Sequence, residues 1–230
     1  MATIVIAGAS RGIGLALVRH YAQAQAGNRI FAWCRNPAGA DALNALAAQS
    51  GGAIDVGTLD MADGESIDRA AASLGGMPVD LLLNVGGLLH RESGPEDRAF
   101  DGWRESFEVM VIGPFRLTQA LLPNLTGAQG KVLSVTSQIG ASTWTSGGLY
   151  SYGAAKAALN RVMKSLAVDL KDRGIAVGVV HPGHVQTDMG GASAAITPDQ
   201  SAEGIAKVAS ALTLDRTGGF FNWTGEPHPW

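Results

Sequence analysis

Two side chains able to exchange a proton lie four residues apart within one predicted helix. Tyr152 and Lys156 occur in a helical pattern that runs from about 149 to 171, so they share one face of that helix. An ammonium group near a phenol favours the phenolate and is expected to lower the phenol pKa from about 10. Such a phenol can exchange a proton with a carbonyl or alcohol oxygen. Tyr150 lies close by but has no lysine at the required spacing.

A serine stands where a predicted strand ends. Ser137 follows residues 131–136, which read as a strand, and active-site residues of open α/β sheets collect at such strand ends. Its hydroxyl could hydrogen-bond a substrate oxygen. Ser137, Tyr152 and Lys156 together predict acid–base chemistry on a carbonyl or an alcohol, although the Y-x-x-x-K spacing alone also occurs on ordinary surface helices.

A glycine-rich turn follows the first predicted strand, residues 3–7, and opens a helix of about 14 residues. Its sequence is Gly8-Ala9-Ser10-Arg11-Gly12-Ile13-Gly14, with the spacing G-x-x-x-G-x-G instead of the commoner G-x-G-x-x-G. Glycines there permit a tight turn and close approach of a pyrophosphate to the backbone. The helix start offers free N–H groups and a positive dipole end. The turn therefore predicts a dinucleotide site, with a plain flexible connection as the alternative.

The residues beyond the turn favour NADP(H) over NAD. An NAD site places an acidic residue about 20 residues after the last glycine. That position here is Cys34, followed by Arg35. Arg11 and Arg35 could both face a 2′-phosphate, while two solvated arginines remain the alternative.

The same turn also matches G-x-S-x-G, the nucleophile motif of α/β-hydrolases, with Ser10 as the nucleophile. We expect the dinucleotide site instead, because the strand before Ser10 opens the sequence and no earlier loop supplies an oxyanion hole. The two hypotheses differ in one observable: a hydrolase would bind no nucleotide.

Composition favours a globular, cytoplasmic protein. Of the 230 residues, 46% are hydrophobic and 16% charged, and the net charge of -3 gives no basic surface for nucleic acid or an anionic membrane. No apolar run approaches the roughly 20 residues that span a bilayer. A lone cysteine, Cys34, excludes a disulfide framework and a cysteine-based metal site, and no metal is expected.

Short apolar runs alternate with helical patterns, as in βαβ units. This alternation predicts one Rossmann-type domain over residues 1–230, with a doubly wound parallel sheet. The expected strands are 3–7, 29–34, 54–59, 79–84, 131–136, 175–181 and 219–222. The expected helices are the one from Gly12, one around Leu43 and Leu46, one over 100–122 interrupted near Gly113-Pro114, and one over 149–171.

The motifs, taken in chain order, resemble the short-chain dehydrogenase/reductase family. They are Gly8/Gly12/Gly14, Asp60, Asn84-Val85-Gly86-Gly87, Ser137, Tyr152/Lys156 and Pro182-Gly183. Within the family, His181-Pro182-Gly183, residues 187–191 and residues 219–225 resemble the C-factor and sniffer-type carbonyl reductases. The resemblance implies an NADP(H)-dependent oxidoreductase that interconverts a small carbonyl compound and its alcohol.

The resemblance also implies roles for single residues. Tyr152 would be the general acid/base, Lys156 would bind the nicotinamide ribose, and Ser137 would orient the carbonyl. Asp60 would contact the adenine and Thr187 the nicotinamide carboxamide. The residues expected to bind the cofactor are Gly8, Ser10, Arg11, Gly12, Ile13, Gly14, Arg35, Asp60, Asn84, Gly86, Tyr152, Lys156, Pro182, Gly183, Val185 and Thr187.

An apolar substrate pocket and a second subunit are further expectations. Leu88, Leu89, Trp144 and Met189 could line the pocket, or pack internally. The alanine-rich helix face around Ala154, Ala158 and Val162 could pair with another subunit in a homodimer or homotetramer, and internal packing explains that face equally well.

One position departs from the family pattern. Many members carry an asparagine three residues before a glycine in the fourth helix, where it holds a water of the proton relay. Here Met110 precedes Gly113 at that spacing. A thioether is a weak acceptor and cannot donate, so it cannot replace the amide. The alternatives are a working enzyme with another relay, and a non-catalytic NADP-binding sensor or signalling protein.

Overall fold

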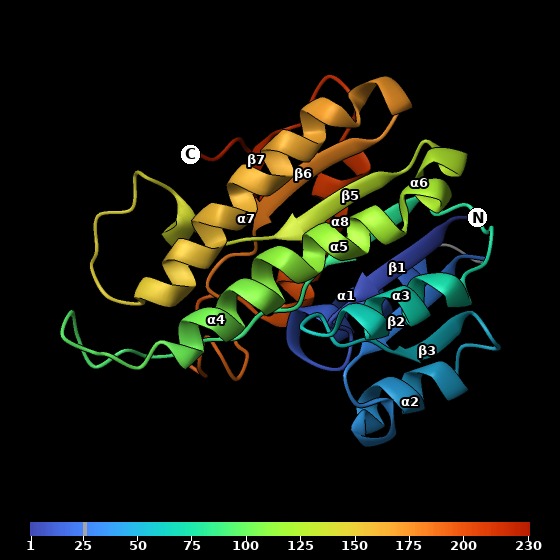
Figure 1. Ribbon diagram of the computed structural model, residues 1–230. Helices are drawn as coiled ribbons and strands as arrows, with labels where there is room; N and C mark the ends of the chain where they lie inside the picture. The colour runs from blue at the N-terminus through green and yellow to red at the C-terminus, as the bar shows by residue number, and fades with distance from the viewer. Residues whose placement is uncertain (25–26) are drawn as a thin grey trace.

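Seven parallel strands form one twisted sheet in the computed structural model, which describes residues 1–24 and 27–230 (Figure 1). The strand order is β3-β2-β1-β4-β5-β6-β7. The strands are β1 (Thr3–Ala7), β2 (Arg29–Cys34), β3 (Ile54–Thr58), β4 (Leu81–Asn84), β5 (Lys131–Val135), β6 (Ala176–His181) and β7 (Phe220–Asn222). The predicted fold class, a Rossmann-type doubly wound sheet, is confirmed.

Helices cover both faces of this sheet. The helices are α1 (Gly12–Ala24), α2 (Asp41–Ala48), α3 (Gly64–Ser73), α4 (Asp101–Phe107), α5 (Gly113–Ala120), α6 (Leu122–Ala128), α7 (Tyr150–Asp169) and α8 (Pro198–Ala211). Alternate residues of β1 divide the core between the faces. Ile4 and Ile6 pack with α1, α2 and α8, whereas Val5 and Ala7 pack with α3, α5 and α7. Among the described residues, no helix is long and apolar enough to cross a bilayer.

The predicted strands agree with the observed ones to within two residues at each end, but three helices, α3, α6 and α8, were not predicted. Two of these, α3 and α8, begin with capping side chains that the hydrophobic pattern did not use. Asp63 caps α3 by accepting from the backbone N–H of Glu65, and Thr197 and Gln200 form a reciprocal capping box at α8. In α3 and α8 the capping residues were therefore a clearer sequence signal than the hydrophobic periodicity.

The long helix expected over 100–122 is divided into segments. A π-helical turn, Glu108–Ile112, separates α4 from α5, and Pro123 lies in the first turn of α6. The Gly113 N–H donates to the carbonyl of Glu108, five residues back, which widens the helix at this point. The interruption therefore falls just before Gly113-Pro114, close to the predicted position.

The strand order reverses direction between β1 and β4, which are neighbours in the sheet although β2 and β3 come between them in sequence. The loops that follow β1 and β4 leave the sheet in opposite directions at such a switch point, and ligands bind in the crevice between them. The residues that follow β1, β4, β5 and β6 therefore meet at one edge of the sheet.

Candidate active site

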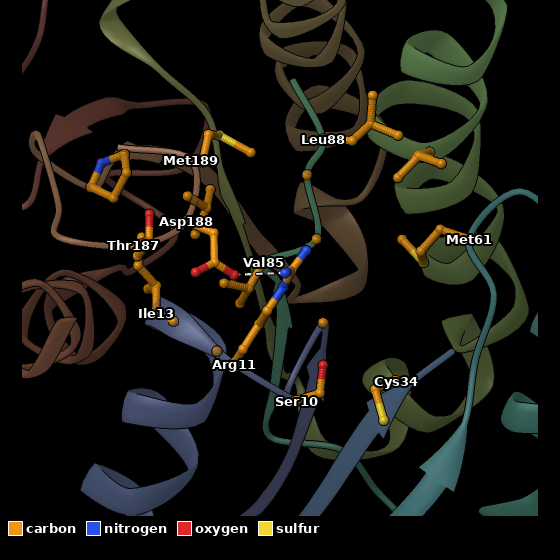
Figure 2. Close-up of a pocket in the computed structure, with 18 of the residues that line it drawn as sticks. Ser10, Arg11, Ile13, Cys34, Met61, Val85, Leu88, Thr187, Asp188 and Met189 are labelled. Carbon is orange, nitrogen blue, oxygen red and sulfur yellow. Dashed lines mark hydrogen bonds and ion pairs between the residues drawn. The ribbon is translucent and has the colours of Figure 1, made fainter. Parts of the chain in front are cut away.

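A cleft of about 430 Å³ opens at the carboxyl edge of the central strands. Figure 2 shows Arg11 extending towards Asp188, to which a dashed line joins it, with Ser10 on the neighbouring backbone. The lining residues that the sequence had singled out are Gly8, Ser10, Arg11, Gly12, Ile13, Gly14, Arg35, Asp60, Gly86, Leu88, Tyr152, Lys156, Pro182, Thr187 and Met189. Most of the predicted cofactor residues thus line one cleft together with two of the three predicted catalytic residues.

The glycine turn is fixed by its backbone. The N–H groups of Gly8 and Ala9 both donate to the carbonyl of Trp33 in β2, at 2.9 and 3.0 Å. Gly8 has a φ of 94°, and a Cβ there would lie 2.7 Å from the Gly86 nitrogen. A Cβ at Gly14 would overlap the carbonyl oxygen of Gly8. The absent side chains leave the start of α1 open towards the cleft, as an anion site requires.

The two arginines expected at the 2′-phosphate have different surroundings. Arg11 forms an ion pair with Asp188 at 2.7 Å, which connects the glycine turn to the loop after β6 (Figure 2). Both side chains are largely exposed, at 72% and 78%. Arg35 also lines the cleft and is exposed, and in the described part of the chain it makes no ion pair. Arg35 is therefore the arginine more available to a bound phosphate.

Asp60, which follows β3, and Asn84, the last residue of β4, have different environments. Asp60 lines the cleft, and its Oδ1 accepts from the N–H of Ala62 at 2.9 Å. Asn84 is buried and does not line the cleft; its Nδ2 donates to the hydroxyl of Ser134 at 3.0 Å. Within the described residues, its Oδ1 has no hydrogen-bond partner. Asn84 thus supports the floor of the site from below.

The loop after β6 brings Pro182 and Thr187 to the cleft, whereas Gly183 and Val185 face away from it. A Cβ at Gly183 would meet Ile196 and the indole of Trp223, so this glycine packs against the neighbouring segments. Val185 is buried. Thr187 lies against the glycine turn, where a Cβ at Gly12 would come within 3.1 Å of its methyl group.

Helix α7 presents Tyr152 and Lys156 to the same cleft. The Nζ atom of Lys156 lies 5.8 Å from the centre of the Tyr152 ring and donates to the carbonyl of Val135, at the end of β5, at 2.8 Å. Ser137 follows that strand and is buried beside the cleft. Its hydroxyl accepts from the N–H of Ile139 at 3.2 Å and so caps the turn Gln138–Gly140. The carboxyl end of β5 therefore holds both the serine and the lysine.

The predicted lowering of the Tyr152 pKa by Lys156 is wrong for this structure. Burial raises the pKa of Tyr152, and hydrogen bonding with Ser137 opposes that rise only in part. Burial also lowers the pKa of Lys156 to about 8. The physical reason is that both groups lie in the apolar interior, which disfavours both charged forms. The Lys156 ammonium is bound to a backbone carbonyl instead of the phenol, so Tyr152 retains its proton at neutral pH.

Comparisons with known proteins agree with this geometry. A family model described as short chain dehydrogenase matches residues 2–196. The chain belongs to the short-chain dehydrogenase family. It is 37% identical over 155 residues to C-signal of Myxococcus xanthus, across 66% of this chain and 93% of that protein.

Two solved structures resemble this short-chain dehydrogenase over its whole length. Carbonyl reductase Sniffer of D. melanogaster superposes with a TM-score of 0.95 and 29% identity, covering 100% of both chains. The NADPH-bound carbonyl reductase from chicken fatty liver gives 0.92 and 31%, covering 100% of this chain and 99% of that one. The predicted resemblance to this family, and to sniffer-type carbonyl reductases within it, is confirmed.

Family membership and geometry both disfavour the hydrolase hypothesis. A serine nucleophile such as Ser10 needs a neighbouring base, most often histidine. In the part of the chain that the structure describes, no histidine lines the cleft around Ser10. The serine lies in the turn that precedes α1, where a dehydrogenase binds its cofactor.

Met110 of the short-chain dehydrogenase is a buried core residue next to the cleft. It lies in the π-helical turn, is 0% exposed, and packs in one apolar cluster with Tyr152 and Ala155. A Cβ at Gly87 would lie 3.8 Å from the Met110 Sδ and 3.8 Å from the Lys156 Nζ. The sulfur therefore occupies space close to the lysine, at the place where the family pattern has an amide.

The predicted apolar pocket is only partly assembled. Leu88 and Met189 line the cleft, as does Val109, which the sequence did not indicate. Leu89 packs in the cluster of Met110, and Trp144 lies on the surface outside the cleft, 38% exposed. Ala158 and Val162 are half-buried against the Met110 cluster as well, so internal packing accounts for part of the small-residue face of α7.

Several cleft residues were given no role by the sequence reasoning, although Val85, Gly87 and Asp188 lie within motifs that it quoted. These residues include Met61, Val85, Gly87, Gln186 and Asp188. Val85 and Gly87 directly follow β4, and a rule that the first residues after each central strand line the crevice would have found them. Gln186 and Asp188 lie in an irregular loop and carried no comparable signal.

Proposed function

We propose that this protein is an NADP(H)-dependent carbonyl reductase. The observation that carries the proposal is the convergence of two independent devices on one cleft. The glycine turn after β1 provides a backbone anion site, and α7 provides Tyr152 and Lys156 within the same cavity. Reduction of a carbonyl to an alcohol needs a hydride donor and a proton donor side by side.

The residues of the cleft fit a dinucleotide with a 2′-phosphate. The cradle at Gly8 and Gly14 has no room for side chains, which is the condition for close approach of a pyrophosphate. Cys34 stands where an NAD site has a carboxylate, and Arg35 beside it supplies a positive charge. The similar chicken structure contains NADPH, which agrees with this assignment. When bound, the cofactor supplies the hydride.

The protein's own residues supply the proton. Tyr152, which burial keeps protonated, donates its phenolic proton to the carbonyl oxygen while the carbonyl carbon receives the hydride. Ser137 opposes the burial-driven rise of the Tyr152 pKa, and its hydroxyl can also bind that oxygen. Lys156 holds a positive charge next to the phenol and stabilises the phenolate that remains. The product of this step is the alcohol.

The substrate class is a small apolar aldehyde or ketone. Leu88, Val109 and Met189 line the cleft and pack in the same apolar cluster as Tyr152. Apolar walls with a few convergent polar groups are typical of sites for small organic ligands.

The test follows NADPH oxidation with a panel of aldehydes and ketones. Tyr152→Phe removes the proton donor and is expected to reduce kcat by about 10² to 10⁴-fold, with the dissociation constant for NADPH little changed. Tyr150→Phe is the matched control, since Tyr150 lies on the same helix outside the cleft. Equal kcat values for Tyr152→Phe and wild type would refute the acid–base role, and an absence of NADPH binding would refute the proposed function.

A second candidate function rests on Met110. A protein with a full cofactor site but a blocked proton relay could serve as a non-catalytic NADP-binding sensor or signalling protein, and the similarity to C-signal is consistent with that role. Met110→Asn distinguishes the two. An increase of kcat by about three- to tenfold would identify a working enzyme limited by its relay. NADPH binding without turnover in both forms, across the panel, would favour the sensor.

A further inference from the structure

The catalytic helix begins without a cap of its own. Leu149, the residue before α7, has a left-handed φ of 50° and its side chain caps nothing, and the first turn contains no acidic residue. By contrast, α3 and α8 start with local capping side chains, Asp63 and Thr197. The first N–H groups of any helix lack partners within the helix and need other acceptors. In α7 these acceptors also affect the site, because Tyr152 lies in the first turn.

Glu92, from the loop between β4 and α4, provides the missing acceptor. Its Oε1 accepts from the backbone N–H of Ser151 at 2.8 Å, across 59 residues of sequence. Burial alone would raise the pKa of Glu92, but hydrogen bonds from Ser151, together with those from the backbone of Glu92 and Tyr150, outweigh it and lower that pKa. Glu92 is therefore a carboxylate held next to the positive end of the helix dipole, an arrangement that stabilises the helix start.

The backbone N–H that Glu92 binds belongs to Ser151, the residue directly before the proposed proton donor Tyr152. Ser151 is fully buried and precedes Tyr152, and the first helical hydrogen bond, from the Gly153 N–H to the Leu149 carbonyl, closes around both at 2.8 Å. If this turn frays, the Tyr152 phenol loses its fixed position relative to Ser137 and Lys156. The loop that carries Glu92 begins with cleft residues Val85 to Leu88, so one segment contacts both the substrate side and the catalytic helix.

We propose that Glu92 is a positioning residue, which fixes the first turn of α7 and thereby holds Tyr152 in its reactive place. The effect on turnover rests on the proposed reductase function, whereas the effect on the helix start does not. Glu92 acts mainly through its hydrogen bond to the Ser151 N–H, so a side chain of the same length with an acceptor oxygen should retain most of the effect.

The experiment compares four variants of the full chain in two measurements. Glu92→Ala and Glu92→Met remove the acceptor, and Met keeps the length of the side chain in case Ala disturbs folding. Glu92→Gln keeps an acceptor oxygen without the charge. Glu96→Ala is the matched control, an exposed glutamate in the same loop. Hydrogen exchange at the Ser151 amide reports on the helix start, and kcat, KM and the NADPH dissociation constant report on the reaction.

The expected results separate position from general stability. Without the acceptor, Ser151 should exchange about five- to tenfold faster, the size of a lost helix cap. We expect kcat to fall by a similar factor, about fivefold or more, while KM and NADPH binding stay within about twofold. Glu92→Gln should restore both readouts to within about twofold of wild type. Glu96→Ala should change neither.

Two outcomes would overturn the proposal. In the first, the Ser151 amide exchanges at the wild-type rate in Glu92→Met, which would mean that the bond does not hold the helix. In the second, Glu92→Gln loses as much as Glu92→Met, which would mean that the charge and not the bond matters. If the wild-type chain reduced none of the panel, the reductase proposal would fail by itself, and the exchange rates would still decide the role of Glu92.

Discussion

The two halves of the cleft are built in different ways. The cofactor half is made from the backbone of neighbouring residues, Gly8 to Gly14, with two bonds to the Trp33 carbonyl. The acid–base half is made from side chains whose partners are distant in sequence. Lys156 bonds to Val135, and Ser151 bonds to Glu92. A backbone cradle tolerates almost no added atom, whereas a side-chain site depends on several separate supports.

This difference predicts different responses to mutation. In the cofactor half a single methyl group should affect folding and binding together, because the atoms it meets belong to the main chain. In the acid–base half, the loss of one support should lower turnover and leave the cofactor in place. Tyr152→Phe and the Glu92 variants test the second half, and the predictions below test the comparison itself.

The largest effect is expected for Gly14→Ala. Its Cβ would overlap the Gly8 carbonyl oxygen and approach the Ala9 Cα within 3.1 Å, so α1 must move away from the turn. We expect a loss of about 3 kcal/mol in the free energy of unfolding, and a loss of at least about tenfold in NADPH affinity. Denaturant unfolding and NADPH fluorescence measure the two quantities.

Gly76→Ala is the control for this change. A Cβ there meets no atom within 4 Å, and Gly76 lies outside the cleft. The comparison between the halves would be broken if Gly14→Ala bound NADPH normally, because the turn would then have slack that the structure does not show.

A smaller effect is expected at His181, a support of the acid–base half. Its Nδ1 accepts from the N–H of Gln138, next to Ser137, at 3.3 Å. Burial, and then the charge of His228, lower the pKa of His181 from 6.5 to about 4. Between these pH values the unfolded chain binds a proton that the folded chain does not, so stability falls as pH falls from about 6.5 to 4.

The size of this acid destabilisation follows from the pKa difference. Discounted for the partial exposure of the ring, it amounts to roughly 2 kcal/mol by pH 4.5. His181→Asn removes the titration and should flatten the stability curve of the folded protein over that range, as measured by denaturant unfolding at a series of pH values. His20→Asn, on α1, should leave the slope unchanged. A wild-type slope in His181→Asn would mean that other groups cause the acid loss.

The same contrast explains how much the sequence could predict. Strands such as 3–7 and 29–34 are mostly apolar runs, and the glycine turn follows the first of them, so spacing alone predicted a turn that the structure brings to the cleft. Tyr152 and Lys156, which the sequence predicted from their spacing on one helix, line the same cleft. Their environment was not predicted, since the burial that reverses the expected pKa change of Tyr152 depends on packing against Met110 and Ala155.

Supports from distant segments had no sequence signal at all. Nothing in the loop around Glu92 indicates that it ends beside Ser151, because that contact depends on where β4 and α7 lie in the sheet. Gly183 and Val185 are the opposite case, because they were predicted to bind the cofactor but do not line the cleft. Both are near Pro182 and Thr187 in sequence, but the loop turns them away from the cleft. Position along a strand edge is predictable, whereas the direction of side chains in an irregular loop is not.

The smallest effect is expected at the outer rim of the cofactor half, where side chains replace backbone. Arg11 is already paired with Asp188, whereas Arg35 makes no ion pair within the described residues, so a 2′-phosphate gains more from Arg35. Arg35→Ala should weaken NADPH binding by about tenfold, which is the size of one partly exposed charge-assisted hydrogen bond. NADH has no 2′-phosphate, so its binding should not change. Arg11→Ala is the matched control and should reduce NADPH affinity by about threefold or less. Arg11 is already paired with Asp188, and an exposed ion pair of this kind contributes little free energy. Titration of both cofactors against both variants measures this order. A larger loss of NADPH affinity for Arg11→Ala than for Arg35→Ala would mean that the ion pair with Asp188 opens to admit the phosphate. Arg11, in the glycine turn, would then determine the specificity for NADP(H).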